Sequence, residues 1–222
     1  MRRTPKSDTA LREAVLSELD WDPEVDARHI GVSANEGAIT LDGYVASYSQ
    51  KVAALHAAER VYGVKAIADG IEVEDLPPGK MTDSEIAEEI AQRLTWNESI
   101  PESVEAEVVK GHVTLRGEVE WGYQRAAAER VVRDLWAVRR VKNEIAVVPR
   151  VEPNPAEIER RVGDAIERLA DLDERSIRVT ARDGTVHLEG HVHSLAERRL
   201  AERAAESAPG VRAVQNDLVV ES

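Results

Sequence analysis

The chain repeats one sequence pattern three times, at intervals of 74 and 73 residues. The segment Gly37–Gly43 (GAITLDG) recurs at those intervals as Gly111–Gly117 (GHVTLRG) and Gly184–Gly190 (GTVHLEG). Two more segments keep the same register, at 63–67, 137–141 and 210–214 and at 69–73, 143–147 and 216–220. A period of roughly 70 residues is too long for a solenoid repeat, and each copy can hold its own small core. The sequence therefore predicts three copies of one module, over residues 1–76, 82–149 and 154–221.

Each copy reads in the order helix, strand, strand, helix, strand. A first helix is indicated by apolar residues at helical spacing. These residues are Leu11, Val15, Leu16 and Leu19 in the first copy, Ile86, Ile90 and Leu94 in the second, and Ile158, Val162, Ile166 and Leu169 in the third. The expected N-cap residues are Ser7, Thr82 and Asn154, and Glu85 and Glu157 are predicted to complete capping boxes.

Two strands follow as a hairpin, with glycine in the turns at 35–37, 110–111 and 182–184. Alternating apolar and polar residues predict a sheet with one covered face and one wet face. An alanine-rich second helix is predicted over 50–61, 124–135 and 196–207, and a last strand over 67–73, 141–148 and 214–220. We expect the right-handed strand–helix–strand crossover to make the outer two strands parallel.

The predicted fold class is therefore α+β. It consists of three tandem α-β-β-α-β modules, each a three-stranded mixed sheet with two helices packed on one face. Prolines in the connecting segments 76–80 and 149–153 predict stiff linkers, which would limit the relative freedom of the modules.

The composition excludes several classes of function. The 222 residues include no cysteine, which excludes disulfides, thiolate metal sites and cysteine nucleophiles. No apolar run is long enough to span a membrane, and no apolar segment follows the basic start at 1–6. We therefore expect a cytoplasmic protein, or a periplasmic one if a leader is missing from the sequence. The net charge of −13 argues against nucleic acid as a partner and against bulk attraction to anionic lipid, so an anionic surface would have to be met by a local patch.

The repeated pattern resembles the BON domain (bacterial OsmY and nodulation domain). The residues that carry the resemblance are clearest in the third copy, at 186–192 (VHLEGHV) and 210–220 (GVRAVQNDLVV). The resemblance covers nearly the whole chain, three times over. It implies a bacterial, non-enzymatic module that attaches to phospholipid surfaces or envelope partners during osmotic or envelope stress. The hallmark glycine of the family corresponds to Gly43, Gly117 and Gly190.

Several recurring residues are interpreted as structural. The hallmark glycines are expected to mark bulges or close backbone approaches. Gly63 and Gly210 suit a left-handed turn after the second helix. The polar residues Asp69, Asn143 and Asn216 share the parity of the apolar residues of the last strand, so we expect them to bridge to backbone in the preceding turn. Trp21 and Trp96, at the end of the first helix, are expected to pack in a core or between modules.

Two groups of residues are candidates for binding. His191 and His193 lie two residues apart on a strand, about 6.7 Å, and could share a metal ion. A metal site there is the least favoured hypothesis, because tetrahedral sites need three or four ligands and the other copies carry no histidine pair. A cationic cluster near the end of the second helix of copy two is the candidate for binding lipid phosphate, through arginine forks and an interfacial tryptophan. Its residues are Arg133, Trp136, Arg139, Arg140 and Lys142. The alternative is that these cations are solvated and only stabilise the C-terminal end of the helix through its dipole.

The sequence carries no catalytic signature: no Walker A loop, no G-x-S-x-G, no H-E-x-x-H and no dinucleotide-binding glycine motif. We therefore predict a protein that is not an enzyme and holds no cofactor. The favoured function is multivalent binding, as an adaptor that contacts an anionic phospholipid surface or an envelope or stress-related protein. A protein–protein scaffold without lipid affinity is the alternative.

Overall fold

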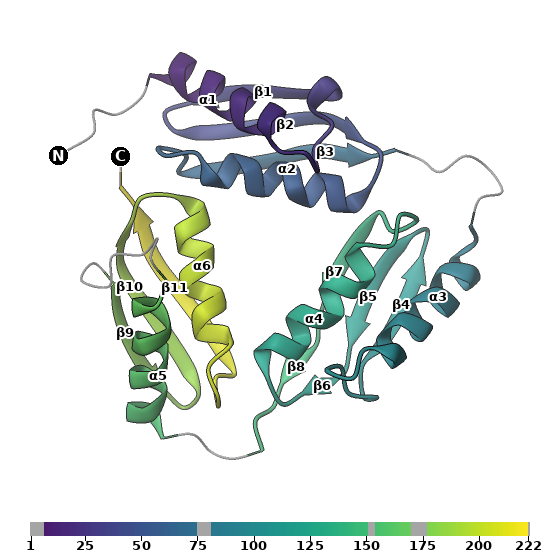
Figure 1. Ribbon diagram of the computed structural model, residues 1–222, viewed down its shortest axis with the longest axis vertical. Helices are drawn as coiled ribbons and strands as arrows, with labels where there is room; N and C mark the ends of the chain where they lie inside the picture. The colour runs from purple at the N-terminus through teal and green to yellow at the C-terminus, as the bar shows by residue number, and fades with distance from the viewer. Residues whose placement is uncertain (1–6, 75–80, 151–153, 170–176, 222) are drawn as a thin grey trace.

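The computed structural model describes residues 7–74, 81–150, 154–169 and 177–221. It contains three modules of the same design, which confirms the predicted fold class (Figure 1). The predicted linkers lie mostly outside the described residues. The elements of the first module are α1 (Asp8–Trp21), a 3-10 turn η1 (Ala27–His29), β1 (Ile30–Asn35), β2 (Ala38–Val45), α2 (Tyr48–Arg60) and β3 (Ala66–Val73).

The other two modules repeat this order. The second contains α3 (Asp83–Trp96), β4 (Glu105–Val109), β5 (His112–Arg116), β6 (Glu118–Val119), α4 (Gly122–Arg133), β7 (Arg140–Asn143) and β8 (Ala146–Val147). The third contains α5 (Pro155–Glu167), β9 (Ile177–Arg182), β10 (Thr185–Val192), α6 (Leu195–Glu206) and β11 (Ala213–Val220). The strands of the second module are interrupted near Gly117, where β6 and β8 continue as a separate parallel pair.

Each sheet has the second strand of its module at the centre. In the first module β2 pairs antiparallel with β1 and parallel with β3, and β10 pairs in the same way with β9 and β11. The prediction that the outer two strands run parallel is wrong, because the crossover joins the central strand to an edge strand. The parallel pair is therefore centre and edge, and the two outer strands run in opposite directions.

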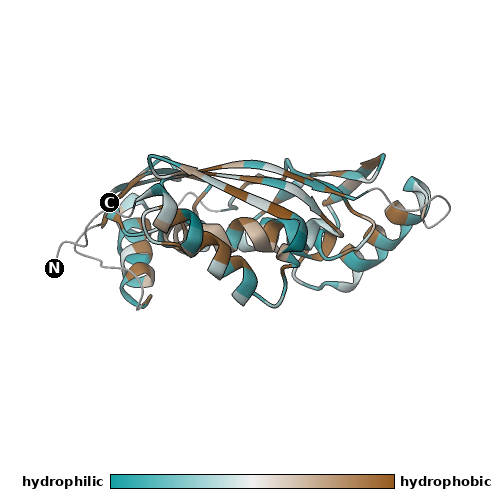
Figure 2. Cartoon of the chain, turned by 90° about the horizontal axis from the view of Figure 1, so that it is seen from above, coloured by the Kyte–Doolittle hydropathy of each residue, from teal (hydrophilic) through white to brown (hydrophobic). Residues whose placement is uncertain are grey.

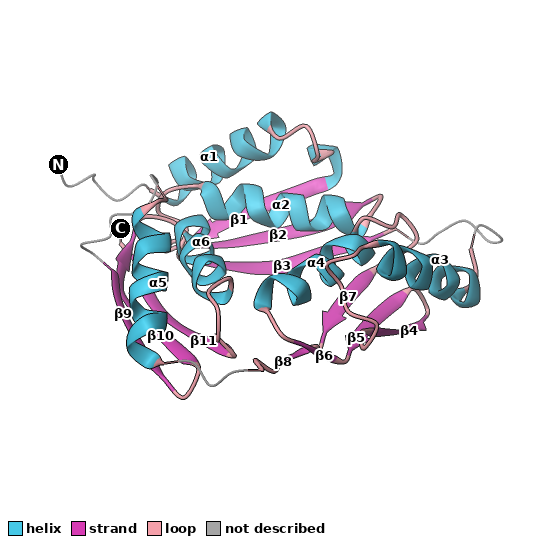
Figure 3. Cartoon of the chain, turned by 60° about the horizontal axis from the view of Figure 1, so that its bottom comes forward, coloured by secondary structure: helices cyan, strands magenta, loops and turns pink. Residues whose placement is uncertain are grey.

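Three separate aliphatic cores lie between the helices and the sheets, one in each module. Both helices of a module cover the same face of its sheet (Figure 3). In the first module, for example, Leu11, Val15 and Leu19 point inward from α1 and are 2% exposed or less. The alanines of α2 allow that helix to lie close to the sheet, since Ala54, Ala57 and Ala58 are fully buried.

The predicted caps are present, with one exception. Ser7, Thr82 and Asn154 each accept a hydrogen bond at a helix start, and Thr82 and Glu85 form the predicted capping box. The predicted box at Asn154 is wrong, because the Glu157 carboxylate instead accepts from Arg161, one turn along α5, at 2.6 Å. An arginine four residues ahead thus outcompetes the backbone N–H for that carboxylate.

The hallmark glycines sit where two backbones meet. Gly43 has φ 123°, and a Cβ there would lie 1.9 Å from the carbonyl oxygen of His29. Gly117 has φ 127° and the same relation to Ser103, at 2.1 Å. Both the left-handed φ and the close approach exclude a side chain. The interpretation of these glycines as structural is consistent with this geometry.

The recurring Asp and Asn residues tie the last strand to the second helix. The Asn143 amide donates to the carbonyl oxygen of Arg125 at 3.0 Å and to the Glu129 carboxylate at 3.1 Å, and its oxygen accepts from the N–H of Ile145 at 3.2 Å. Asn216 makes the equivalent three contacts in the third module. In the first module, Asp69 accepts from the N–H of Ile71 at 3.1 Å and pairs with Lys51 at 2.8 Å. A backbone partner was predicted, but the backbone partners belong to the second helix and to the last strand itself and not to the preceding turn.

The three modules form a closed, triangular ring rather than a row. The second helices α2, α4 and α6 face its middle, and the first helices lie further out (Figure 1). Viewed from the edge, the strands lie along one side of the molecule and the helices along the other (Figure 2). The third module therefore contacts the first as well as the second.

Candidate functional site

The junctions between modules are built from one position of the repeat, the first residue of the second helix. Its three occurrences are Tyr48, Gly122 and Leu195. Tyr48 packs against the core of the second module, and Leu195 packs against the core of the first. Gly122 lies against the end of α6, where a Cβ would come within 2.2 Å of the carbonyl oxygen of Glu206. Each module thus reaches the next one in the same direction, and the head-to-tail arrangement closes after three steps.

Ion pairs reinforce two of the three junctions. Arg125 of α4 pairs with Glu206 of α6, and Arg199 of α6 pairs with Glu59 of α2. The side chains of these four residues are between 23% and 32% exposed, so the pairs are partly desolvated. Burial raises the pKa of the Glu206 and Glu59 carboxyls, and the partner arginines oppose that shift. At the register of Glu59 and Glu206, the second module carries Arg133, which has the opposite charge.

A half-buried histidine, His56 of α2, lies beside these arginines. Burial is the main cause that lowers its pKa, to about 3, and the positive charges of Arg199, Arg203, Arg133 and Arg60 lower it further. Two acidic residues, Asp22 and Glu24, also lie near the imidazole of His56. The imidazole is therefore neutral at pH 7, in a strongly positive environment.

The structure divides the predicted cationic cluster between two surfaces. Arg133 is half-buried at the junctions of the ring, with its guanidinium 3.5 Å from the Asp134 carboxylate. Arg140 and Lys142 lie on β7 with their side chains on the wet face of the sheet, and Lys142 pairs with Glu144 at 2.5 Å. Trp136, in the turn between α4 and β7, is 45% exposed. The Arg139 stem packs over the turn at Gly111, where a Cβ would lie 3.3 Å from its Cδ.

The two tryptophans at the end of the first helix are exposed, so the expectation that they pack in a core or a junction is wrong. Trp21 is 83% exposed and Trp96 is 76% exposed. Each follows the last buried leucine of its helix, Leu19 or Leu94, by two residues. Two residues turn the helix by about 200°, which places the indole on the side away from the sheet.

The two candidate metal ligands have carboxylate neighbours of their own. The imidazole Nδ1 of His193 lies 3.3 Å from Glu197, and that of His191 lies 3.9 Å from Glu221. Within the described ranges, no group of three or more His, Cys, Asp or Glu residues is placed to hold a metal ion. In the same ranges, no helix is long and apolar enough to cross a membrane.

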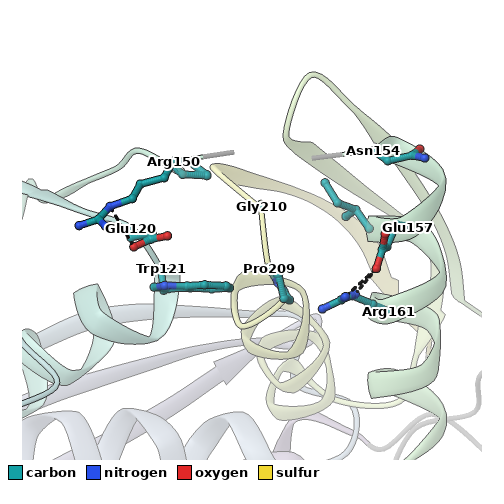
Figure 4. Close-up of a pocket in the computed structure, with 10 residues that line it drawn as sticks. Glu120, Trp121, Arg150, Asn154, Glu157, Arg161, Pro209 and Gly210 are labelled. Atoms are coloured by element: carbon teal, nitrogen blue, oxygen red, sulfur yellow. Dashed lines mark hydrogen bonds and ion pairs between the residues drawn. The ribbon is translucent and has the colours of Figure 1, made fainter. Parts of the chain in front are cut away.

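A cavity of about 370 Å³ lies between the first and second modules, where His56 and Asp134 are among the lining residues. Two more cavities involve the third module. One, of about 370 Å³, is lined by Trp121 of the second module and Pro209 of the third (Figure 4). Its arginines already have carboxylate partners, since Arg161 pairs with Glu157 and Arg150 with Glu120 at 3.4 Å. The other, of about 500 Å³, is lined by residues of all three modules and by several arginines.

Comparison with known proteins identifies the class of protein. The BON domain profile matches residues 7–75, 82–149 and 154–222, so the chain belongs to the BON domain family and contains three such domains. Osmotically-inducible protein Y of Escherichia coli (strain K12) is similar, at 28% identity over 143 residues, which is 62% of this chain and 71% of that protein.

Two solved structures are also similar, both of CdsD, a structural protein of the type III secretion system of Chlamydia trachomatis. One covers 94% of this chain and 91% of its own length; the other, a C-terminal domain, covers 98% and 100%. Both are 15% identical to this chain, with a TM-score of 0.26.

Proposed function

We propose that the chain is a non-enzymatic adaptor of the osmotic stress response, and that it binds a protein partner through Trp21 and Trp96. The observation that carries the proposal is the pair of indoles at the same place in two modules, 83% and 76% exposed. Single exposed hydrophobic residues are common, but a large aromatic side chain left in water at two equivalent positions is not explained by packing. Tryptophan is also the residue most enriched where binding energy concentrates.

The charge around the two indoles favours a protein over an anionic membrane. Helices α1 and α3 each carry four acidic residues and one arginine. At Trp21, the neighbouring carboxylates Glu18 and Asp22 both bind Arg60, at 2.7 Å. An anionic bilayer would repel these acidic helices, whereas an apolar pocket with a basic rim would complement them. Two such contacts on one chain gain avidity if the partner offers two sites.

The context of osmotic stress is proposed from the similarity to Osmotically-inducible protein Y. The anionic phospholipid surface remains the competing partner. It would use the exposed cations Arg140 and Lys142 beside Trp136, although Lys142 already has an acidic neighbour in Glu144.

The test compares the wild-type chain with the double variant Trp21→Ala and Trp96→Ala. Purified protein is used to capture partners from native cells after an osmotic upshift, and each captured protein is then purified and titrated directly. The matched control replaces two exposed residues on strands, Val109→Ala and Val219→Ala, which are 55% and 58% exposed. We expect one partner to bind wild type and control equally and to bind the tryptophan variant at least tenfold more weakly.

A vesicle flotation experiment distinguishes binding to a protein partner from binding to an anionic phospholipid surface. Wild-type protein is floated with vesicles of phosphatidylcholine, with and without phosphatidylglycerol. The proposal fails if the tryptophan variant keeps every partner of the wild type. It also fails if binding is confined to phosphatidylglycerol vesicles and is removed by Arg140→Glu and Lys142→Glu.

A further inference from the structure

The larger cavity lies where the three second helices converge. The basic residues that line it include one equivalent residue from each module: His56 of α2, Arg130 of α4 and Arg203 of α6. They occupy the same position of the repeat, with the intervals of 74 and 73 residues that relate the modules. The pseudo-threefold arrangement of the modules thus brings one repeat position from each of them to a common space.

The cavity holds more positive than negative charge. Its lining includes the arginines Arg125, Arg130, Arg133 and Arg203 and only two carboxylates, those of Glu129 and Glu206. Both carboxylates are already engaged, since Glu206 pairs with Arg125 and Glu129 accepts from Asn143. A local excess of two positive charges is unusual in a chain with a net charge of −13.

Arg203 acts electrostatically on the Glu59 and Glu206 carboxyls and opposes the burial that raises their pKa, but no ion pair within the described residues joins it to either. No side-chain hydrogen bond or ion pair joins Arg130 or Arg203 to a described residue. Arg130 and Arg203 are exposed, and they line the same cavity as the half-buried Arg133, whose contact with Asp134 is long at 3.5 Å. Like charges gathered in this way repel one another, and a bound anion would relieve the repulsion.

We propose that the cavity at the centre of the ring binds a small, multiply charged phosphate-bearing anion, held by Arg130, Arg203 and Arg133. Guanidinium groups bind phosphate through paired N–H donors, and three of them from two modules can surround one anionic group. A volume of about 500 Å³ falls within the range of small-molecule sites. It leaves room for a pyrophosphate group with further atoms attached, such as a nucleoside or sugar phosphate.

Burial is the main cause of the low pKa of His56, and two of the proposed ligand residues, Arg203 and Arg133, lower it further. An anion between the arginines would reduce that repulsion and make protonation of His56 easier. The neutral imidazole can also accept or donate a hydrogen bond to the ligand.

The proposed site is formed by contacts between modules, so ligand binding affects how stable those contacts are. No single module supplies all the cations, so the anion stabilises the closed arrangement over any arrangement in which the modules separate. Only the contact between the third and first modules is made without a linker, and Arg203 and His56 lie on opposite sides of it. Ligand binding therefore favours closure of the ring through contact of the anion with His56, the lining residue that the first module supplies.

The test is calorimetric titration of the whole chain with inorganic pyrophosphate, at low and at physiological salt. We expect saturable binding with one site for each chain. The double variant Arg130→Gln and Arg203→Gln should bind at least tenfold more weakly for each arginine removed. The matched control, Arg28→Gln and Arg182→Gln, removes two exposed arginines elsewhere, 79% and 88% exposed, and should bind as the wild type does.

Three results would overturn the proposal. They are the absence of saturable heat with wild-type protein, equal loss in the cavity and control variants, and equal heats with sulfate or chloride at the same ionic strength. Vesicles of phosphatidylcholine and phosphatidylglycerol distinguish a lipid headgroup from a free anion. If the arginine variant loses vesicle binding while wild type ignores pyrophosphate, the ligand is a lipid and the proposal is wrong. The site does not rest on Trp21 or Trp96, so it can fail or succeed independently of the adaptor function.

Discussion

Replacing Gly122 with alanine tests whether the modules close into a ring. A Cβ at this position would lie 2.2 Å from the carbonyl oxygen of Glu206 and 3.0 Å from its carbon. An ordinary contact needs more than 3 Å, and the obstacle is backbone, which cannot rotate away as a side-chain end can. Helix α4 and the end of α6 must therefore separate by about 1 Å, which costs roughly 1–3 kcal/mol by analogy with overpacked cores.

The separation also pulls apart Arg125 and Glu206, which pair across the same junction. Gly163 provides the matched control, since a Cβ there would meet nothing within 4 Å inside α5. Gly163→Ala should stabilise by about 1 kcal/mol through helix propensity alone. We therefore expect the two variants to differ by about 2–4 kcal/mol, with opposite signs relative to wild type.

Thermal unfolding and small-angle scattering read out the two consequences. A difference of about 2–4 kcal/mol corresponds to roughly 4–16 °C in a chain of this size. If the junction opens without loss of the module cores, the scattering radius of Gly122→Ala increases instead, while that of Gly163→Ala does not. A Gly122→Ala protein with the radius of the wild type and the stability of Gly163→Ala would refute the closed arrangement.

Three further predictions concern single positions. Asn143→Ala should destabilise the second module by about 1–3 kcal/mol in urea unfolding, because it leaves the carbonyl and carboxylate of its hydrogen-bonded partners on α4 without their donor. Gly43→Ala should prevent correct folding of the first module, seen as loss of amide-exchange protection there, because the new Cβ would overlap the His29 carbonyl. As pH falls from 6.5 toward 3, stability should decrease by up to about 1.4 kcal/mol per pH unit through His56, because the unfolded state takes up a proton near pH 6.5 and the folded state only near 3. His56→Gln should lose about 1–2 kcal/mol less than wild type between pH 7 and 5, and identical pH curves would contradict the assigned environment of the ring.

Much of the module was predictable from the sequence because its determinants are local. Apolar spacing located the helices, and the repeat aligned three hairpins whose turns do adopt left-handed φ at residues such as Glu36 and Gly37. The exposure of Trp21 was also predictable, because its distance of two residues from Leu19 fixes its side of the helix. The error came from treating a large aromatic residue as core without applying the helical phase.

The ring could not be predicted in the same way. Its three junctions use one repeat position, but the residues there are tyrosine, glycine and leucine, which share no chemistry. The cationic cluster was divided for a related reason: Arg133 lies on a helix that faces other modules, whereas Arg140 and Lys142 lie on the wet face of a sheet. Proximity in sequence indicated one patch, and only the packing of modules separates it. The convergence of His56, Arg130 and Arg203 likewise depends on how the modules meet.

The head-to-tail closure implies that the order of the modules along the chain is not essential to the architecture. Each module meets the next through the start of its second helix, and the junction of the third with the first is held by Leu195 and by the pair of Arg199 and Glu59 without any peptide connection. A circular permutant that joins β11 to α1 and begins at α3 would keep all three junctions. Its tolerance would mean that duplication of one ancestral unit could have produced this ring from any starting point around the circle.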